Sequence, residues 1–511
     1  MAWEKQLEEL DRRREWSKRM GGPEKIKRQH DAGKLTVRER IDGLVDQGSF
    51  REIGSLVGHG QYDEKGDLID FTPSNVLVGH AKVDARPVVV VGDDFTVRGG
   101  ANDGAVGDKM IVAEQMAYDL KLPLIRLVDG TGGGGSVKNI ERLGHTLLPK
   151  MKIWWFIARN LTEVPVVSLA LGSVAGQGAA KVAGSHYSVM VKDTSQLFVA
   201  GPPVVARIGQ AYSKNELGGS GIHTRNGVVD DEVESEEQAF AAARRFLSYL
   251  PSAVGKPNPE GTRPAQISDQ TWLRDVIPEN PRQVYKVRPI IESLLDPGSF
   301  MEIGKQWGKA IVGGLGRLQG HSVLLVASNP FHYGGAWDRQ TAEKFVRYIE
   351  LAETFRLPVI HIVDIPGFQI GLQAEQEGVM RAGVNALNAV ARTTVPWFSL
   401  IIRKAFGVAA GGHQNSGRFN FRCAWPSAQW GSLPIEGGLE VAYKADIEAA
   451  NDPEAKRDEI EQRVRALTSP FRSAEAFVIE EIIDPAQTRT KLEEFIEIAS
   501  QINSDQTQAR K

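Results

Sequence analysis

The chain has 511 residues but only one cysteine, Cys423. A single thiol excludes an internal disulfide framework, a CxxC redox pair and a cysteine-rich zinc site. The charges nearly cancel, because 61 Lys and Arg stand against 64 Asp and Glu and leave a net charge of −3. Since there is no excess of positive charge, the composition gives no support to nucleic-acid binding.

Long apolar runs are absent as well. No stretch approaches the roughly 20 apolar residues that span a bilayer. The N-terminus, Met1-Ala2-Trp3-Glu4-Lys5, is acidic within its first residues and fits neither a secretory signal nor an organelle presequence. We therefore expect no membrane association and a cytoplasmic protein, with a mature mitochondrial matrix form as the alternative.

Three common catalytic motifs are missing, namely G-x-x-x-x-G-K-[ST], G-x-S-x-G and H-E-x-x-H. The sequence therefore contains no motif for ATP hydrolysis, serine-esterase chemistry or zinc-protease chemistry. Gly130, Gly132 and Gly135 fit the dinucleotide-binding pattern G-x-G-x-x-G. That fingerprint needs an acidic residue about 20 positions later, where the chain reads KMKIWW at 150–155. A dehydrogenase thus ranks last among the alternatives.

The sequence contains an internal repeat. IDGLVDQGSFREIG at 41–54 returns as IESLLDPGSFMEIG at 291–304, an offset of 250 residues. LPLIRLVD at 122–129 returns as LPVIHIVD at 357–364, an offset of 235 residues. Between the copies, 251–283 collects Pro, Gly, Asn, Ser and Thr, which mark a linker. We therefore predict two domains, 1–260 and 261–511, that arose by duplication.

Short β-branched runs such as 88–91 and 124–128 and the apolar run 164–169 alternate with helical stretches such as 108–120 and 341–355. Runs that are apolar on both faces indicate buried strands of a largely parallel sheet. The predicted fold class is α/β.

Glycine-rich turns occur twice in each half. The first pair is 129–136 with 364–368, and the second is 172–180 with 403–412. In parallel α/β folds such turns lie at the carboxyl ends of strands, where backbone N–H groups can form an oxyanion hole. The alternative is that Gly176 and Gly407 only allow close packing of helix on strand, and the residues alone do not separate these two explanations.

These motifs resemble the carboxyltransferase (β) subunit of biotin-dependent acyl-CoA carboxylases, the propionyl-, acetyl- and methylcrotonyl-CoA carboxylase group. The resemblance covers essentially the whole chain, and six segments carry it: 21–54, 193–205 (DTSQLFVAGPPVV), 216–230 (ELGGSGIHTRNGVVD), 362–368 (IVDIPGF), 403–407 (RKAFG) and 478–489 (VIEEIIDPAQTR). It implies two tandem crotonase-like domains, each a ββα superhelix, and a homo-hexamer built as a trimer of dimers.

The resemblance also implies where the chemistry takes place. The acyl-CoA would lie on domain 1–260 and the biotin on domain 261–511 of a neighbouring subunit. The amides of Gly176 and Gln177 would hold the thioester enolate oxygen. The amides of Gly407, Val408 and Ala409 would polarise the ureido oxygen of biotin, and the freed biotin nitrogen would take the proton.

Further positions are implied to bind substrate. Arg403 would read the transferred carboxylate, with a surface ion pair as the alternative. Gly411 and the glycines Gly132, Gly133 and Gly134 would line the pocket. The family's arginine in an SGGARI-like loop is absent here, and Val408 replaces a common glycine. The identity of the acyl group is therefore open.

No AMKM-like biotinylation segment is present. Biotin and its ATP-dependent carboxylation would thus come from partner chains, a biotin carboxylase and a biotin carboxyl carrier, and we expect no metal in this chain. Two alternatives share the fold: the carboxyltransferase component of a biotin-dependent decarboxylase, and a non-catalytic scaffold that binds acyl-CoA.

Overall fold

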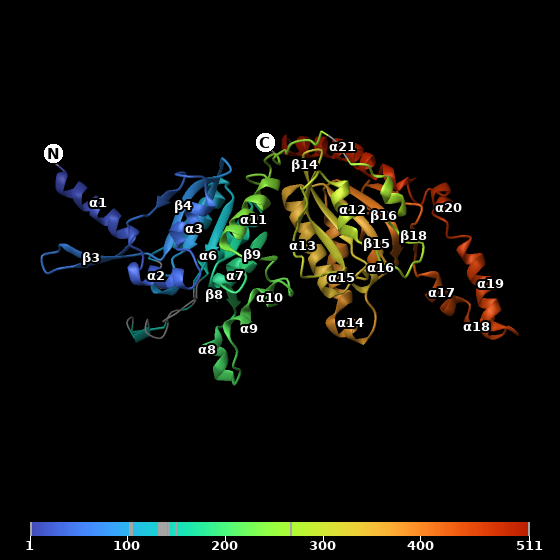
Figure 1. Ribbon diagram of the computed structural model, residues 1–511, viewed down its shortest axis with the longest axis horizontal. Helices are drawn as coiled ribbons and strands as arrows, with labels where there is room; N and C mark the ends of the chain where they lie inside the picture. The colour runs from blue at the N-terminus through green and yellow to red at the C-terminus, as the bar shows by residue number, and fades with distance from the viewer. Residues whose placement is uncertain are drawn as a thin grey trace. The chain divides into compact units, whose positions relative to one another are not determined.

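The computed structural model describes residues 3–101, 106–130, 140–141, 144–146, 148, 151–265 and 268–508. The chain divides into two compact units, Met1–Lys256 (unit 1) and Pro257–Lys511 (unit 2). Figure 1 colours unit 1 from blue to green and unit 2 from yellow-green to red. Among the described residues, no helix is both long enough and apolar enough to cross a membrane.

Unit 1 is built on a seven-stranded sheet with the order β1-β4-β5-β6-β7-β9-β11. The pairs β1/β4 and β4/β5 are antiparallel, and every later pair is parallel. A hairpin, β2/β3, and a parallel pair, β8/β10, stand outside this sheet. The strands are β1 (Arg51–Ile53), β2 (Gly58–Tyr62), β3 (Leu68–Pro73), β4 (Val76–Val83), β5 (Arg86–Asp93), β6 (Leu124–Val128), β7 (Val166–Ala170), β8 (Ser173–Ala175), β9 (Tyr187–Val191), β10 (Gln196–Phe198) and β11 (Asp231–Val233).

Helices complete unit 1. In Figure 1, α3 and α11 lie beside the sheet, and they contact each other, whereas α4 packs against α6. A capping box begins α3, since Thr36 accepts from the Glu39 N–H while the Glu39 side chain accepts from the Thr36 N–H. The helices are α1 (Glu4–Lys18), α2 (Pro23–Asp31), α3 (Val37–Leu44), η1 (Arg98–Gly100), α4 (Lys109–Leu120), α6 (Lys152–Asn160), α7 (Gln177–Ala183), α8 (Pro202–Val205), η3 (Ala206–Ile208), α9 (Lys214–Gly218), α10 (Ser220–His223) and α11 (Glu236–Tyr249).

Unit 2 repeats the same strand order, β12-β13-β14-β15-β16-β17-β19, with β18 paired to the end of β16. Again the first two pairs are antiparallel and the rest parallel. One long strand, β16, covers the length that unit 1 divides between β7 and β8. The strands are β12 (Met301–Glu302), β13 (Ile311–Leu318), β14 (His321–Ser328), β15 (Val359–Ile365), β16 (Trp397–Phe406), β17 (Phe421–Ala424), β18 (Gln429–Gly431) and β19 (Glu481–Ile482).

The central strand of unit 2 is buried on both faces. Ile360 and Ile362 belong to the core formed with α12 and α21, whereas the His361 ring lies 5.3 Å from the ring of Phe345 on α13. Such alternation follows from the two-residue period of a strand.

The helices of unit 2 are η4 (Thr271–Asp275), α12 (Val287–Leu294), η5 (Tyr333–Gly335), α13 (Arg339–Phe355), α14 (Leu372–Glu377), α15 (Val379–Arg392), α16 (Gly407–Ala410), η6 (Gly411–His413), α17 (Ile435–Ala442), α18 (Lys444–Glu448), α19 (Pro453–Arg465), α20 (Pro470–Glu475), η7 (Pro485–Gln487) and α21 (Thr488–Gln508).

The predicted α/β class and the duplication are confirmed. The run 124–128 forms β6 as expected, and the helix expected at 108–120 begins at Lys109. The strand expected at 164–169 forms two residues later, as Val166–Ala170, because Pro165 has no N–H to donate to a sheet.

Candidate functional site

A buried carboxylate ends the central strand of each unit. Asp129 directly follows β6, Asp364 lies near the end of β15, and neither side chain is exposed. Asp129 accepts hydrogen bonds from Arg40 Nη1 (2.8 Å) and Lys34 Nζ (3.1 Å). Desolvation lowers the pKa of Arg40, but the charges of Asp129 and Glu236 outweigh it, so the pKa lies above its ordinary value. Each glycine-rich turn therefore starts from an aspartate that is fixed in the interior.

The two units supply the arginine from different elements. Arg40 comes from α3, whereas Arg403, which pairs with Asp364, comes from β16. In the repeat, Arg403 corresponds to Gly172, and a Cβ on Gly172 would lie 1.9 Å from the Asp129 Oδ1 atom. Unit 1 thus has Gly172 where unit 2 has Arg403, because the Asp129 carboxylate occupies the space that a side chain at position 172 would need.

Arg403 is buried and its guanidinium has internal partners. Its Nε and Nη2 atoms donate to Asp364 Oδ2 at 3.0 and 2.8 Å, and Nη1 donates to the Gln283 carbonyl at 2.8 Å. The guanidinium also lies over the Tyr285 ring, 4.8 Å from its centroid. The alternative of a surface ion pair is therefore wrong, since the pair with Asp364 is buried. The role of Arg403 in reading the transferred carboxylate stays a prediction, and these contacts favour a positioning role.

The second glycine-rich turn of unit 1 leads into α7. Gly176 is exposed and has φ = 59°, a conformation that favours glycine, and Gln177 is the first residue of the helix. The Gly176 N–H donates to the Phe198 carbonyl of β10 at 3.2 Å. The Gly176 N–H thus has an acceptor inside the fold, and the expectation that the Gly176 and Gln177 amides hold an enolate oxygen stays a prediction. The other first-turn N–H groups of α7 have no acceptor within the helix itself.

The far end of α7 is held by a buried arginine. Arg126 Nη1 donates to the carbonyls of Lys181 (3.0 Å) and Gly184 (2.9 Å), and its Nε and Nη2 atoms bind Glu114. Arg126 corresponds to His361 in the repeat, whose Nδ1 lies 3.3 Å from the His413 carbonyl. In both units, a side chain of the central strand thus fixes the short helix that follows the turn.

The corresponding turn of unit 2 lies beside a small cavity. Gly407 has φ = 64° and begins α16, Val408 is 59% exposed and Ala409 is buried. The cavity has a volume of about 210 Å³, and both Gly407 and Gly411 line it. First-turn N–H groups have no acceptor inside their own helix. That these amides bind a ureido oxygen stays a prediction. Gly132, Gly133 and Gly134 lie outside the described residues.

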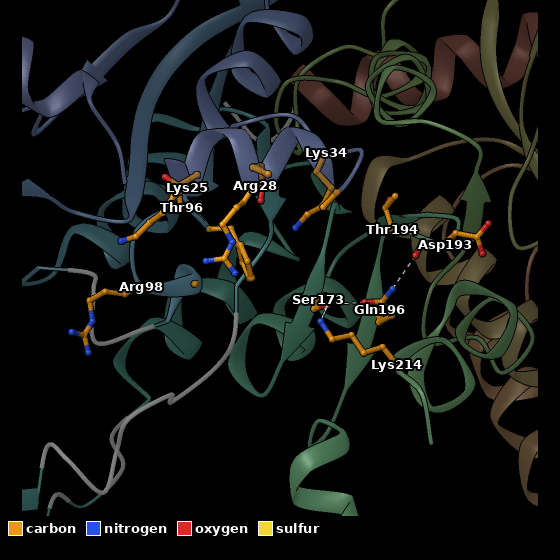
Figure 2. Close-up of a pocket in the computed structure, with 14 residues that line it drawn as sticks. Lys25, Arg28, Lys34, Thr96, Arg98, Ser173, Asp193, Thr194, Gln196 and Lys214 are labelled. Carbon is orange, nitrogen blue, oxygen red and sulfur yellow. Dashed lines mark hydrogen bonds between the residues drawn. The ribbon is translucent and has the colours of Figure 1, made fainter. Parts of the chain in front are cut away.

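Unit 1 contains a larger cavity of about 570 Å³, which we call the basic cavity. Figure 2 shows side chains from α2, η1, β8 and α9 around it. Five of its lining residues are cationic and one is acidic, and the complete lining is Lys25, Arg28, Gln29, Ala32, Lys34, Phe95, Thr96, Arg98, Gly99, Ser173, Asp193, Thr194, Gln196 and Lys214.

Some of these cations are not neutralised by carboxylates. Lys25 and Arg28 lie on the exposed side of α2 and form no ion pair with any residue that the structure describes. Lys214 Nζ donates to the Ser173 hydroxyl at 3.2 Å. By contrast, Lys34 pairs with Asp129 and lies over the Phe95 ring, 4.3 Å from its centroid. A concave surface with this excess of positive charge suits a phosphorylated ligand.

The sequence did not reveal the basic cavity, because its members are separated by as many as 189 positions, from Lys25 to Lys214. The available signal was the charge of α2, whose segment 23–31 reads PEKIKRQHD. Without its neighbours, that segment is indistinguishable from an ordinary solvated helix.

Comparison with known proteins decides the family. The carboxyl transferase domain model matches residues 28–511. The chain belongs to the carboxyl transferase domain family. It is 34% identical to the propionyl-CoA carboxylase carboxyltransferase subunit of Haloferax mediterranei, over 96% of this chain and 95% of that protein. It is 31% identical to the biotin-dependent acetyl-/propionyl-coenzyme A carboxylase beta5 subunit of Mycobacterium tuberculosis, over 94% of this chain and 90% of that protein.

Solved structures of this family agree. A transcarboxylase 12S hexamer with methylmalonyl-coenzyme A and methylmalonic acid bound aligns with a TM-score of 0.87 at 28% identity, over 96% of this chain and 94% of that one. A single-chain, multi-domain long-chain acyl-CoA carboxylase aligns with a TM-score of 0.80 at 28% identity, over 96% of this chain and 50% of that one. The predicted pair of tandem crotonase-like domains and the carboxyltransferase activity are thereby confirmed.

Proposed function

We propose that the protein is the carboxyltransferase component of a biotin-dependent acyl-CoA carboxylase, a ligase that forms a carbon–carbon bond. It would move a carboxyl group from carboxybiotin, a substrate carried by a partner chain, to the enolate of an acyl-CoA. The basic cavity of unit 1 is the observation that carries the proposal, because it gives one of the two substrates a binding site of the right charge.

Coenzyme A has a diphosphate and a 3′-phosphate, so it is a compact polyanion at one end. Lys25, Arg28 and Lys214 offer donors to such groups, and a phosphate oxygen accepts most strongly from charged donors. Lys25, Arg28 and Lys214 are exposed, so solvent and salt screen their charges, and binding through them should weaken as the salt concentration rises. The basic cavity therefore fits the nucleotide end of an acyl-CoA.

The cavity is continuous in the chain with the turn that would hold the thioester. Ser173 lines the cavity and begins β8, which ends at Ala175, directly before Gly176. An extended strand advances about 3.3 Å per residue, so the turn begins about 10 Å from the wall of the cavity. We place the thioester carbonyl at the start of α7, where first-turn N–H groups would stabilise the enolate oxygen.

The smaller cavity of unit 2 differs in charge. Its one lining arginine, Arg422, is paired with Glu480 at 2.7 Å, and Trp430, Ile401 and Ile479 make its wall largely apolar. An uncharged bicyclic ring such as that of biotin suits this lining, with the Gly407, Val408 and Ala409 amides facing the ureido oxygen. Carboxybiotin would supply the carboxyl group. This chain would bind both substrates, orient them and stabilise the negative charge of the enolate oxygen.

The assembly belongs to the same proposal. A related protein, transcarboxylase 12S, is a hexamer, and we infer the same arrangement here, with a biotin carboxylase and a biotin carboxyl carrier as partners in the cytoplasm.

The basic cavity is tested by calorimetric titration of acetyl-, propionyl- and butyryl-CoA into the protein and a Lys25→Glu/Arg28→Glu variant. We expect the variant to bind about tenfold or more weakly, since two phosphate contacts become repulsive. Lys27→Glu is the matched control, because Lys27 lies on the same helix but pairs with Asp31 and does not line the cavity. Equal affinity of the three proteins would refute this location for coenzyme A.

A further inference from the structure

Lys214, one of the exposed cations of the basic cavity, is held by an uncharged group. Its Nζ atom donates to the Ser173 hydroxyl at 3.2 Å, and it forms no ion pair with any residue that the structure describes. Lys34, by contrast, pairs with the buried carboxylate of Asp129. The contact of Lys214 with a neutral acceptor therefore leaves its positive charge available to a ligand.

The Ser173 hydroxyl belongs to a chain of hydrogen bonds between β8 and β10. The register of this parallel pair sets Ser173 opposite Gln196, and Ser173 Oγ donates to Gln196 Oε1 at 2.6 Å. Gln196 Nε2 donates to the Asp193 carbonyl at 3.1 Å and to Asn215 Oδ1 at 2.8 Å. Gln196 is buried, so the chain runs from the interior to the Lys214 ammonium, and Figure 2 shows these side chains together.

The direction of each bond in this chain follows from one backbone group. The Asp193 carbonyl can only accept, so the Gln196 amide turns its nitrogen to that carbonyl and its oxygen to Ser173. A hydroxyl has a single hydrogen, and Ser173 gives it to this amide oxygen. The lone pairs of the hydroxyl therefore remain for the Lys214 ammonium, which can only donate.

The backbone of Lys214 is fixed as well. Lys214 is the first residue of α9, which begins with a capping box: the Ser213 hydroxyl accepts the Glu216 N–H, and the Glu216 side chain accepts the Ser213 N–H. The next residue, Asn215, joins the same helix to β10 through Gln196. Both the Cα atom and the ammonium of Lys214 are thus positioned by hydrogen bonds.

Unit 2 shows that the fold does not require a serine at this place. In the repeat, Ser173 and Gln196 correspond to Lys404 and Gln429, which stand in the same register between β16 and β18. A lysine replaces the serine there, so unit 2 has no hydroxyl at this position to hold a cation. Because the strand pair forms with either residue, strand pairing does not explain the Ser173 hydroxyl.

We propose that Ser173 and Gln196 are positioning residues, which hold Lys214 on the wall of the basic cavity where it binds a phosphate group of the acyl-CoA. The inference rests on the proposed function and gives a role in it to two uncharged residues. An exposed lysine samples many rotamers, and ordering it when the ligand binds costs affinity. Because the hydroxyl orders the side chain before the ligand arrives, that cost is smaller.

The chemistry of the acceptor matters for this role. A carboxylate at position 173 would bind the ammonium more strongly, but it would also neutralise Lys214 and repel a phosphate. The hydroxyl of Ser173 fixes the cation and leaves its remaining hydrogens to a phosphate oxygen.

The test is calorimetric titration of coenzyme A, which carries the phosphates without an acyl group, into the wild type, Ser173→Ala, Lys214→Ala and the double variant. Ser173→Ala should weaken binding about 3- to 10-fold, the loss expected when one long side chain must be ordered by the ligand. In the Lys214→Ala background, Ser173→Ala should change the affinity less than about twofold, since no ammonium remains to be positioned. Ser173→Thr keeps the hydroxyl and should bind within about twofold of the wild type.

A series of KCl concentrations gives a second readout. Salt screens the contact between an exposed lysine and a phosphate, so Ser173→Ala and Lys214→Ala should both make binding less sensitive to salt than it is in the wild type. Ser49→Ala is the matched control, because Ser49 bonds to the Lys82 backbone and does not line the cavity. Its affinity and salt sensitivity should equal those of the wild type.

The outcomes separate this inference from the proposed function. An unchanged affinity in Ser173→Ala, or a loss that is equally large in the Lys214→Ala background, would overturn the positioning role while leaving coenzyme A binding intact. If the wild type does not bind coenzyme A, the proposed function fails and this inference fails with it. If thermal unfolding shows that Ser173→Ala does not fold, Ser173→Cys takes its place, since a thiol accepts only weakly.

Discussion

Replacing Asp129 by Asn should destabilise unit 1 by about 3 kcal/mol. The carboxylate is fully buried and accepts from Arg40, Lys34 and Gln29 at 2.8 to 3.1 Å. Breaking a buried ion pair from one side costs about 3–5 kcal/mol, because an uncompensated charge remains. Arg40 keeps Glu236 as a second partner at 2.7 Å, so the lower end of that range applies.

The assay is urea unfolding, with amide hydrogen exchange on β6 to assign the loss to unit 1. The control is Asp31→Asn, which removes an exposed pair with Lys27 and should cost less than about 0.5 kcal/mol. The double variant Asp129→Asn/Arg40→Met should show a coupling energy of about 1–3 kcal/mol. A loss below about 1 kcal/mol for Asp129→Asn, or an equal loss in the control, would refute the reasoning.

Three further predictions concern stability and reactivity. Gly172→Ala should lower the thermal midpoint strongly, since its Cβ would meet the Asp129 carboxylate at 1.9 Å, whereas Gly411→Ala, with nothing within 4 Å, should leave the midpoint unchanged. The pKa of Asp93, raised from 3.8 to about 6, means that the folded state binds more protons than the unfolded state between those values. The contribution of this site to the free energy of unfolding should thus fall by about 1–3 kcal/mol as the pH rises from about 4 to 6. In Asp93→Ser, unfolding measured over the same pH range should lack this decrease. A decrease as large as that of the wild type would contradict the prediction. Burial raises the pKa of the Cys423 thiol to about 12, so a disulfide reagent at pH 8 should label only the unfolded chain, and rapid labelling of the native protein would contradict this.

The sequence predicted the elements well and the contacts poorly. The repeat and the buried β-branched runs were sufficient for the α/β class, since strand burial leaves a local pattern. The partner of Arg403 required knowing that β15 and β16 are neighbours, so that Asp364 lies within reach. The acceptor of the Gly176 N–H comes from β10, more than 20 positions away.

The basic cavity also depends on contacts between residues that are distant in the sequence. Lys25, Arg98, Ser173 and Lys214 come from four separate elements, and only tertiary packing brings them together. The contrast between Asp93 and Ser328 is different. The repeat aligns these two residues, so the sequence contained that contrast. Only the structure shows that both side chains accept the N–H of their own unit's buried aspartate, Asp129 or Asp364, so that a serine suffices as the acceptor.

Carboxyl transfer from a carboxylated biotin carrier tests the central claim most directly. Acetyl-, propionyl-, butyryl-, methylcrotonyl- and geranyl-CoA would each be incubated with the protein and the carrier and analysed by mass spectrometry. We predict that at least one thioester gains the mass of one carboxyl group. If none does, while the same carrier remains competent with a known transferase, the assignment as an acyl-CoA carboxyltransferase is contradicted.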